Sequence, residues 1–266
     1  MFLFKKSFDS KVYGWSRKDN IPNVGDELAR KIVREILLFN DINETDFLKK
    51  IKNQKLMSIG SVMHFAKTQD VIWGTGVNGK VDINLHKFGQ LDVRAVRGPK
   101  TRNFLMERNI EVPEIYGDPA LLSSMFFPKA AFTNLETRKP FLVIPHMSEI
   151  NTYRKKFSED SICSPLQYPF DFIKKILSAE KIYSSSLHGI ILAETYGIPV
   201  VWMRSDNGED DFKYYDYYEG TGRHSPPKEF SFEGFKCLEF SEILDLEKIQ
   251  INLLKSFPLD FWNKRI

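Results

Sequence analysis

The sequence predicts an α/β protein of two halves, each a doubly wound parallel sheet with helices on its faces. Three observations support this fold class. Short apolar runs typical of buried strands alternate with segments of helical periodicity along most of the chain. Two early runs end at glycines, Gly60 and Gly74, as strands do where they open into turns. Residues 133–140 are polar and without periodicity, and we expect them to link the halves.

The first half begins with a helix and continues with strands. Leu28, Ile32 and Ile36 recur at helical spacing, which predicts a helix over residues 26–39. Pro99 suits the first turn of a second helix, because the missing N–H of proline costs nothing there. The predicted strands cover residues 55–59, 70–73 and 91–96, and residues 115–122 are predicted as a further strand and a turn that contains Gly117-Asp-Pro119.

The second half repeats this alternation. Its predicted strands are residues 141–144, 161–163, 181–183 and 199–203, and its predicted helices are 149–157, 169–179 and 187–196. A last helix is predicted over residues 241–254. We therefore expect an N-terminal Rossmann-like domain (1–135), a C-terminal Rossmann-like domain (136–240) and a helical tail (241–266), with the ligand in the cleft between the domains.

Composition limits the classes of function. Thirty-eight Lys and Arg against 35 Asp and Glu leave a net charge of +3, and 42% of the residues are apolar, so we expect neither disorder nor nucleic-acid binding. Cys163 and Cys237 are far apart and have no metal-ligand spacing, which predicts reduced, buried thiols and no metal site. No stretch is typical of a signal peptide or a membrane span, and we expect a cytoplasmic protein.

The strongest local motif is a hydroxyl-rich turn that begins a helix, Ser184-Ser-Ser186-Leu-His188-Gly189. The first amides of a helix have no intrahelical partners and its N-terminus carries partial positive charge, so this turn favours a phosphate or carboxylate. A histidine there can donate a proton near neutral pH. A lone His188 would more often be a packing residue, but the serines and Gly189 beside it favour a ligand site.

Arg97 and Asp26 are two further candidates. Arg97 ends a predicted strand directly before a helix, and arginine suits the planar capture of carboxylate or phosphate. The alternative for Arg97 is an ion pair with a nearby acid. Asp26 lies in the first turn of a predicted helix, where it either caps the helix or presents a carboxylate to the cleft.

Four motifs occur in an order that resembles the polysaccharide pyruvyltransferase family, most closely bacterial exopolysaccharide ketal-pyruvate transferases. They are Asn23-Val-Gly-Asp26-Glu, Arg97-Gly-Pro-Lys-Thr101, Gly117-Asp-Pro-Ala120 and Ser186-Leu-His-Gly189. The resemblance, which runs from about residue 20 to about residue 220, implies two domains facing a cleft, as in type B glycosyltransferases (GT-B). It also implies phosphoenolpyruvate as the donor, a pyruvate ketal on hydroxyls of a surface or exopolysaccharide glycan as the product, release of phosphate, and no cofactor.

The resemblance further implies roles for individual residues. The expected donor contacts are Arg97, Ser186, Leu187 and His188. His188 would be the general acid, since the donor must be protonated at its methylene carbon. The base that deprotonates the acceptor is open, with Asp26 first, then Asp118, then His146.

Acceptor recognition is expected around the aromatic and acidic stretch 208–219, because sugars present C–H faces to rings and hydroxyls to carboxylates. The expected acceptor contacts are Asn23, Asp118, His146, Tyr214, Tyr215 and Tyr217. The alternative, a helix whose tyrosines only pack on the domain, stays open.

Two other functions also stay open. A nucleotide-sugar glycosyltransferase of the GT-B fold would use the same helix start, with Glu194 on the ribose, and a non-catalytic glycan-binding protein would keep the fold without the chemistry. A polysaccharide acceptor can be lipid-linked. Phe257, Phe261 and Trp262 lie near basic residues and are either a peripheral contact with the inner membrane or a packed C-terminal tail.

Overall fold

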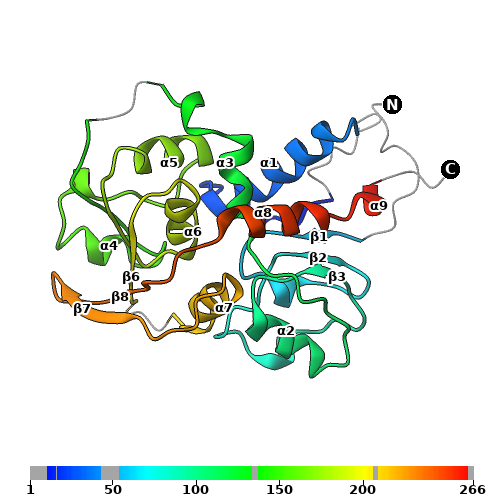
Figure 1. Ribbon diagram of the computed structural model, residues 1–266. Coiled ribbons are helices and arrows are strands. Elements are labelled where there is room, and N and C mark those ends of the chain that lie inside the picture. The colour runs from blue at the N-terminus through cyan, green and yellow to red at the C-terminus, as the bar shows by residue number, and fades with distance from the viewer. Residues whose placement is uncertain (1–10, 16, 43–53, 134–136, 206–208, 263–266) are drawn as a thin grey trace.

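The computed structural model describes residues 11–15, 17–42, 54–133, 137–205 and 209–262, and it contains two sheets with helices between and around them (Figure 1). The α/β class predicted from the sequence is confirmed. The helices of the described residues are α1 (Val24–Phe39), α2 (Pro99–Met106), α3 (Ser123–Phe126), α4 (Ile150–Tyr153), α5 (Pro169–Ile176), α6 (Leu187–Thr195), α7 (Phe212–Gly220), α8 (Leu246–Lys255) and α9 (Leu259–Trp262).

The first sheet is parallel and has the order β1 (Leu56–Met57), β2 (Val71–Trp73), β3 (Asp92–Ala95). Single parallel bridges at Val12 and Tyr116 extend it on both sides. The three strands fall inside the predicted runs and are shorter than them. In the predicted strand and turn over residues 115–122, the strand is reduced to a bridge at Tyr116, and Asp118 then caps a 3-10 helix, η5 (Pro119–Leu122), with its side chain.

The second sheet has the order β4 (Leu142–Ile144), β5 (Ile182–Ser184), β6 (Val200–Met203), β8 (Phe235–Glu239), β7 (Lys228–Phe232). β4, β5 and β6 are parallel, as predicted, whereas β7 and β8 form a hairpin that adds to β6 in antiparallel fashion. The expectation of a purely parallel sheet is therefore wrong at this edge. Glu233 and Gly234 form the hairpin turn with φ angles of 50° and 80°, the left-handed backbone that two-residue hairpin turns require. The strand predicted over residues 161–163 is reduced to a single bridge at Ile162.

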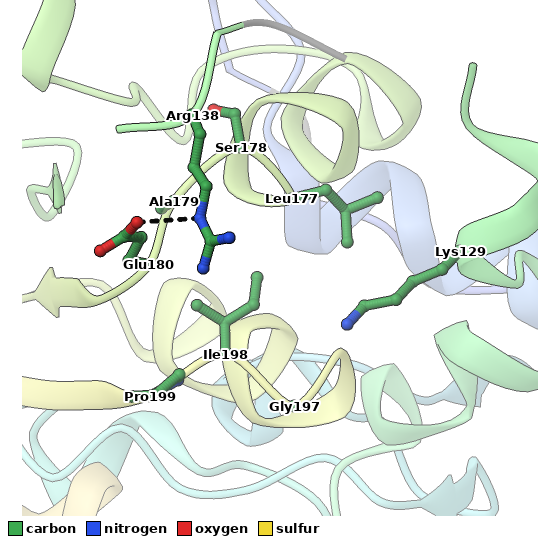
Figure 2. A pocket seen from close by; sticks show the side chains of 9 residues that line it. All are labelled: Lys129, Arg138, Leu177, Ser178, Ala179, Glu180, Gly197, Ile198 and Pro199. Atoms are coloured by element: carbon green, nitrogen blue, oxygen red, sulfur yellow. Dashed lines mark ion pairs between the residues drawn. The ribbon is translucent and has the colours of Figure 1, made fainter. Parts of the chain in front are cut away.

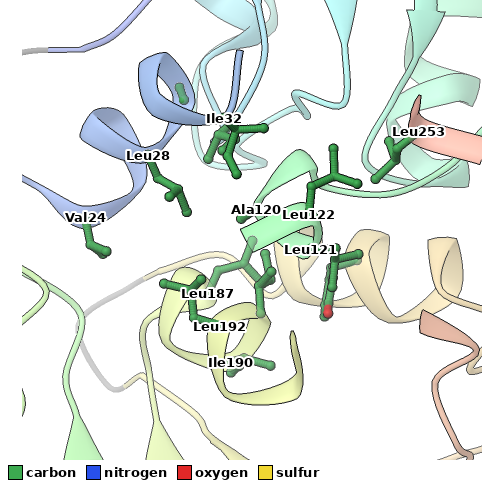
Figure 3. Packing of buried hydrophobic residues seen from close by; sticks show 14 of the residues in the cluster. Val24, Leu28, Ile32, Ala120, Leu121, Leu122, Leu187, Ile190, Leu192 and Leu253 are labelled. Atoms are coloured by element: carbon green, nitrogen blue, oxygen red, sulfur yellow. The ribbon is translucent and has the colours of Figure 1, made fainter. Parts of the chain in front are cut away.

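The main hydrophobic core joins the two halves. Figure 3 shows Leu28 and Ile32 of α1 on one side of η5 and the apolar side chains of α6 on the other. Leu121 and Leu122 of η5 are fully buried between these helices. Because this one cluster contains side chains from both sheets and from α8, burial of apolar surface holds the two sheets against each other.

The C-terminal helix α8, red in Figure 1, returns to the first half of the chain. The indole Nε1 of Trp73 donates to the Leu253 carbonyl at 3.0 Å, and Gln250 donates to the Leu121 carbonyl at 2.7 Å. A helix was predicted over residues 241–254, and α8 starts later because Asp245 caps it. The proposed boundary at residue 135 lies outside the described residues.

The aromatic residues of the tail are mostly buried. Phe257 and Trp262 are 5% and 3% exposed, and Phe257 packs edge-on against Trp73 with ring centroids 4.9 Å apart. These contacts favour the packed tail over the membrane contact. None of the helices in the described ranges combines the length and apolar character of a membrane span.

The two cysteines, Cys163 and Cys237, are buried and are not joined by a disulfide. Within the described ranges, no three side chains of metal-binding type come together as a metal site would require.

Candidate active site

A cavity of about 300 Å³ lies where the carboxyl ends of strands from both sheets meet. Its wall includes Ser61 after β1, His146 after β4 and Ser186 after β5. The carboxyl ends of parallel strands are the usual ligand-binding edge of such sheets. This hollow, called the central cavity below, is therefore the candidate active site.

Helix α6 begins at the wall of the central cavity. Ser186 is its N-cap and accepts a hydrogen bond from the Gly189 amide at 3.4 Å, while Ser184 Oγ accepts one from the Ser186 amide at 3.0 Å. The amides of Leu187 and His188 are in the first turn and have no intrahelical acceptor. Since Ser186, Leu187 and His188 all line the cavity, the helix start predicted to bind an anion lies at a ligand-sized hollow.

His188 is held between α1 and η5. A Cβ on Gly25 of α1 would lie 2.2 Å from His188 Cε1, so only glycine leaves room for the imidazole. On the other side, Asp118 Oδ2 is 4.0 Å from His188 Nε2, and neither atom has a hydrogen-bond partner among the described residues. Burial, reinforced by nearby basic side chains, lowers the pKa of His188 to about 3, so the imidazole is neutral near pH 7.

Asp118 lies behind His188 rather than in the cavity wall. Its side chain is fully buried, and Oδ1 accepts a hydrogen bond from the Ala120 amide at 2.9 Å. Burial raises the pKa of Asp118 to about 6. Full burial contradicts the predicted contact of Asp118 with an acceptor, and its unpaired oxygen faces His188 instead.

The start of α1 contributes Asn23 and Asp26 to the cavity wall. Asn23 is the N-cap, and its Oδ1 accepts a hydrogen bond from the Gly25 amide at 3.0 Å. Burial raises the pKa of Asp26 to about 7, although a hydrogen bond from the Trp15 backbone opposes the change. A carboxyl group with this pKa gains and loses a proton near neutral pH, as a general base must.

Arg97 is fully buried and does not line the central cavity. Its Nε donates to Asp216 Oδ2 at 2.9 Å, Nη2 to the Val77 carbonyl at 2.7 Å and Nη1 to Ser61 Oγ at 2.6 Å. Arg97 is thus paired with an acid, but inside the fold and not at the surface, which was the alternative expected for it, and the acid lies 119 residues further on. The predicted direct contact of Arg97 with a ligand does not fit this burial, and Arg97 reaches the cavity only through Ser61, which it holds in the wall.

The cationic side chains that do line the cavity are Lys80 and Lys213. Lys213, on α7, is 5% exposed and pairs with Glu209, whose other carboxylate oxygen pairs with Lys80. Burial, the largest influence, lowers the pKa of Lys213, and Glu209 opposes this change. Burial also acts to raise the pKa of Glu209, but Lys213 and the other basic neighbours outweigh it and lower that pKa to about 2. Two lysines around one carboxylate leave the wall positively charged.

His146 lines the cavity near this cluster. Its amide donates to Ser185 Oγ at 2.8 Å, its Nδ1 is 2.8 Å from Ser148 Oγ, and its Nε2 is 3.9 Å from a Glu209 oxygen. Burial first, and then Lys213, lower the pKa of His146 to about 4. As a base it is thus weaker than Asp26.

The tyrosines of α7 lie in the core. Tyr214 and Tyr217 are 1% and 0% exposed. Tyr214 stacks on Trp202 with ring centroids 4.4 Å apart and donates its hydroxyl to the Ser185 carbonyl at 2.6 Å, while Tyr215 packs edge-on against the same indole. None of the three lines the central cavity. Tyr214 and Tyr217 are buried and Tyr215 is half-buried, as in the packed-helix alternative, and contact of these three tyrosines with an acceptor stays a prediction.

Glu194, which the glycosyltransferase interpretation places on a ribose, is occupied by protein partners. Arg223 donates to both carboxylate oxygens, to one of them at 3.0 Å, and Tyr217 donates its hydroxyl to the same group. Arg223 itself is 4% exposed and lies over the ring of Tyr218 at 4.4 Å. The carboxylate is therefore not offered to a nucleotide.

Sequence reasoning did not assign twelve residues of the cavity wall: Trp15, Gly60, Ser61, Val62, His64, Phe65, Asn78, Lys80, Val81, Met147, Pro165 and Lys213. Most of them lie in loops without a local motif. One signal was present, because Ser61 directly follows Gly60 at the end of a predicted strand, where sites form. Lys213 had no such signal, since its neighbours are the aromatic and acidic residues of α7.

Another cavity, of about 360 Å³, opens at the opposite, amino ends of β5 and β6 (Figure 2). Lys129 and Arg138 supply its positive charge, and Arg138 pairs with Glu180 at 2.9 Å. Both partners are exposed, at 78% and 51% of their side chains, and exposed pairs of this kind contribute little. The hollow lacks the buried, convergent polar groups of the central cavity.

Comparisons with known proteins point to one family. The family model for polysaccharide pyruvyl transferase matches residues 23–207, which include every residue of the central cavity wall except Trp15 and Lys213. The uncharacterized protein L143 of Acanthamoeba polyphaga mimivirus is 33% identical over 180 residues, which cover 64% of this chain and 61% of that protein. The chain thus matches less than two thirds of that relative's length. No solved structure matches the chain.

Proposed function

Because this chain belongs to the polysaccharide pyruvyl transferase family, we propose that it moves the pyruvate group of phosphoenolpyruvate onto two hydroxyls of a glycan and releases phosphate. We also propose a GT-B-like frame of two Rossmann-like domains divided near residue 135. The frame is supported by the central cavity, which takes its wall from loops that follow strands of both sheets. A cleft of this kind brings a donor and an acceptor together.

The observation that carries the proposal is the buried lysine of the central cavity. Lys213 is 5% exposed yet lines the hollow, and a buried ammonium group needs anionic partners. Glu209 is shared with Lys80, which leaves one positive charge without a partner in this cluster. Phosphoenolpyruvate carries two anionic groups. We assign one to Lys80 and Lys213 and the other to the amides of Leu187 and His188 at the start of α6.

The reaction adds one proton to the donor and removes two from the acceptor. Protonation turns the methylene carbon into a methyl group and makes the neighbouring carbon electrophilic. One acceptor hydroxyl adds to that carbon, the bond from carbon to the phosphate oxygen breaks, and the second hydroxyl adds in its place. Of the two hydroxyl protons, one replaces the proton given to the methyl group and the other leaves with hydrogen phosphate.

In this proposal His188 supplies the proton and Asp26 accepts one. Burial and basic neighbours keep the pKa of His188 at about 3, and a donor with two anionic groups would raise it by placing negative charge beside the ring. Asp118 Oδ2, 4.0 Å from Nε2, would then face an imidazolium ion. The pKa of Asp26, about 7, suits the removal of a hydroxyl proton near neutral pH.

Thermal unfolding with added phosphoenolpyruvate tests the donor site. A ligand at about 100 times its Kd stabilises the fold by about 2.7 kcal/mol, which raises Tm by several degrees, and the same concentration of UDP is expected to have no effect. Lys213→Met should weaken donor binding at least about tenfold. The matched control is Lys228→Met, which replaces an exposed lysine of β7 outside the cavity.

Turnover is measured as phosphate released from phosphoenolpyruvate in the presence of methyl hexosides. His188→Gln should bind the donor and release no phosphate, because glutamine donates a hydrogen bond but no proton. Stabilisation by UDP-sugars and not by phosphoenolpyruvate, or full turnover by His188→Gln, would overturn the proposal.

A further inference from the structure

A second hollow, of about 160 Å³, continues the central cavity along the first turn of α1. The two hollows share Trp15, Asn23 and Asp26. They therefore adjoin at these three side chains, and we treat them as one groove with a donor end (the central cavity) and an α1 end (the second hollow). The side chains found only at the α1 end include Asn20 and Tyr168.

The two ends differ in charge. The donor end is lined by Lys80 and Lys213, whereas the only basic side chain at the α1 end among the described residues is Arg17. Both Arg17 Nε and Nη2 donate to the carboxylate of Asp19, at 2.9 Å and 2.6 Å, so its charge is already matched. The α1 end therefore suits an uncharged polar ligand and not a second anion.

The chemistry of the α1 end is that of a sugar site. Trp15 is half-buried in the wall that the two ends share, and Tyr168 is 56% exposed on the far side. An aromatic ring offers a flat apolar face to the C–H groups of a pyranose, while carboxylates and amides accept and donate hydrogen bonds to its hydroxyls. Asp26, Glu27 and Asn23 supply these groups. The volume is below the about 300–1,000 Å³ of drug-sized sites, which favours one ring.

We propose that the α1 end is the acceptor subsite, in which one pyranose ring of a glycan lies against Trp15 and turns two hydroxyls toward Asp26. This inference rests on the proposed function for the donor end. Asp26 borders both ends of the groove, and Gly25 beside it touches His188 of the donor end. Asp26 and His188 both line the donor end, so the residue that accepts the hydroxyl proton and the residue that protonates the donor border the same hollow. Trp15 takes the place of the buried α7 tyrosines as the aromatic surface for the sugar.

Binding of neutral sugars without donor tests this subsite. The probes are the methyl glycosides of glucose, galactose and mannose, titrated by ligand-observed NMR into wild-type protein and four variants. Trp15→Leu should weaken glycoside binding at least about tenfold, whereas Trp15→Phe, which keeps a flat ring, should stay within about threefold of wild type. The matched control is Phe39→Leu, which removes an 84% exposed aromatic at the other end of α1 and should leave binding unchanged.

Thermal shifts with phosphoenolpyruvate on the same proteins keep the two proposals apart. Tyr168→Leu, which changes a side chain that lines the α1 end and not the donor end, should weaken glycoside binding and retain the wild-type shift. A single cooperative unfolding transition shows that Trp15→Leu is folded. Two results would overturn the acceptor subsite. One is glycoside binding by Trp15→Leu that equals wild type. The other is that none of the three glycosides binds wild type with a Kd below about 50 mM, which is weaker than most specific binding. Absence of a phosphoenolpyruvate shift in wild type, with glycoside binding intact, would instead overturn the donor assignment alone.

Discussion

Replacing His188 by glutamine should make the protein less sensitive to acid. In the folded chain, burial first and then nearby basic groups lower the pKa of His188 to about 3, from an ordinary value of 6.5. The unfolded chain therefore binds a proton between these two pH values and the folded chain does not. Where the unfolded state binds more protons than the folded state, lowering the pH favours unfolding. The free energy of unfolding of wild type therefore decreases as the pH drops below about 6.5.

The size of the effect follows from the two pKa values. Between about pH 7.5 and about pH 5, a histidine with these pKa values costs the fold about 2 kcal/mol. The side chain of His188 is only 19% exposed, so solvent screening takes little away from this figure. The pKa of Asp118, its nearest acid, is governed by burial, backbone hydrogen bonds and Arg97 and not by His188, so Asp118 contributes about equally in wild type and variant.

The measurement is urea unfolding of wild type and His188→Gln at both pH values, followed by tryptophan fluorescence. From the higher to the lower pH, the free energy of unfolding of wild type should decrease by about 2 kcal/mol more than that of His188→Gln. His224→Gln, which replaces an exposed histidine outside the cavity, is the matched control. A shift below about 0.5 kcal/mol, less than the usual net worth of one hydrogen bond, would refute the claim that the fold holds His188 neutral.

Three further substitutions probe the packing around the site. Gly25→Ala should lower kcat more than it raises the KM for phosphoenolpyruvate, because a Cβ at this position would lie 2.2 Å from His188 Cε1 and must displace the imidazole ring. Unchanged kinetics would show that the ring has room for the added methyl group. Asp216→Asn should cost about 3–5 kcal/mol in urea unfolding because it leaves the buried charge of Arg97 without its carboxylate, and a loss under about 1 kcal/mol, typical of exposed pairs, would contradict a buried pair. Tyr217→Phe should cost about 1–3 kcal/mol by leaving a buried acceptor on α6 with one donor fewer, while donor binding measured by thermal shift stays as in wild type.

The parts of the fold that were predicted correctly depend on short-range signals. The start of α6 is set by the Ser186 side chain, which bonds the amide three residues further on. The start of α1 was predicted less well, because Asn23 and not Asp26 caps it and the helix begins at Val24, two residues before the predicted start. β1 and β2 lie within predicted runs because their apolar residues have to be buried, whereas β3 lies within its predicted run although only Ala95 of its four residues is buried. The β7–β8 hairpin was missed because its strands carry several charged residues and alternate poorly.

The candidate site likewise has parts that depend on neighbouring residues, which could be predicted, and parts that depend on distant residues, which could not. The motif around His188 could be recognised because a helix start that binds anions is built from consecutive residues. The ion pair of Arg97 could not be recognised from the sequence, because the carboxylate that neutralises the guanidinium group lies 119 residues further on. Lys213 and the tyrosines of α7 share one short helix, yet the lysine lines the cavity and the tyrosines enter the core.

The sequence by itself determined the α/β class, the family motifs and the local geometry of the helix starts, since hydrogen bonds, caps and periodicity act over a few residues. Only the tertiary structure decided which charged groups stay available to a ligand and which are neutralised inside the fold. The physical reason is that the exposure, pKa and ion pairing of a side chain depend on the atoms packed against it, and at this site those atoms come from both sheets.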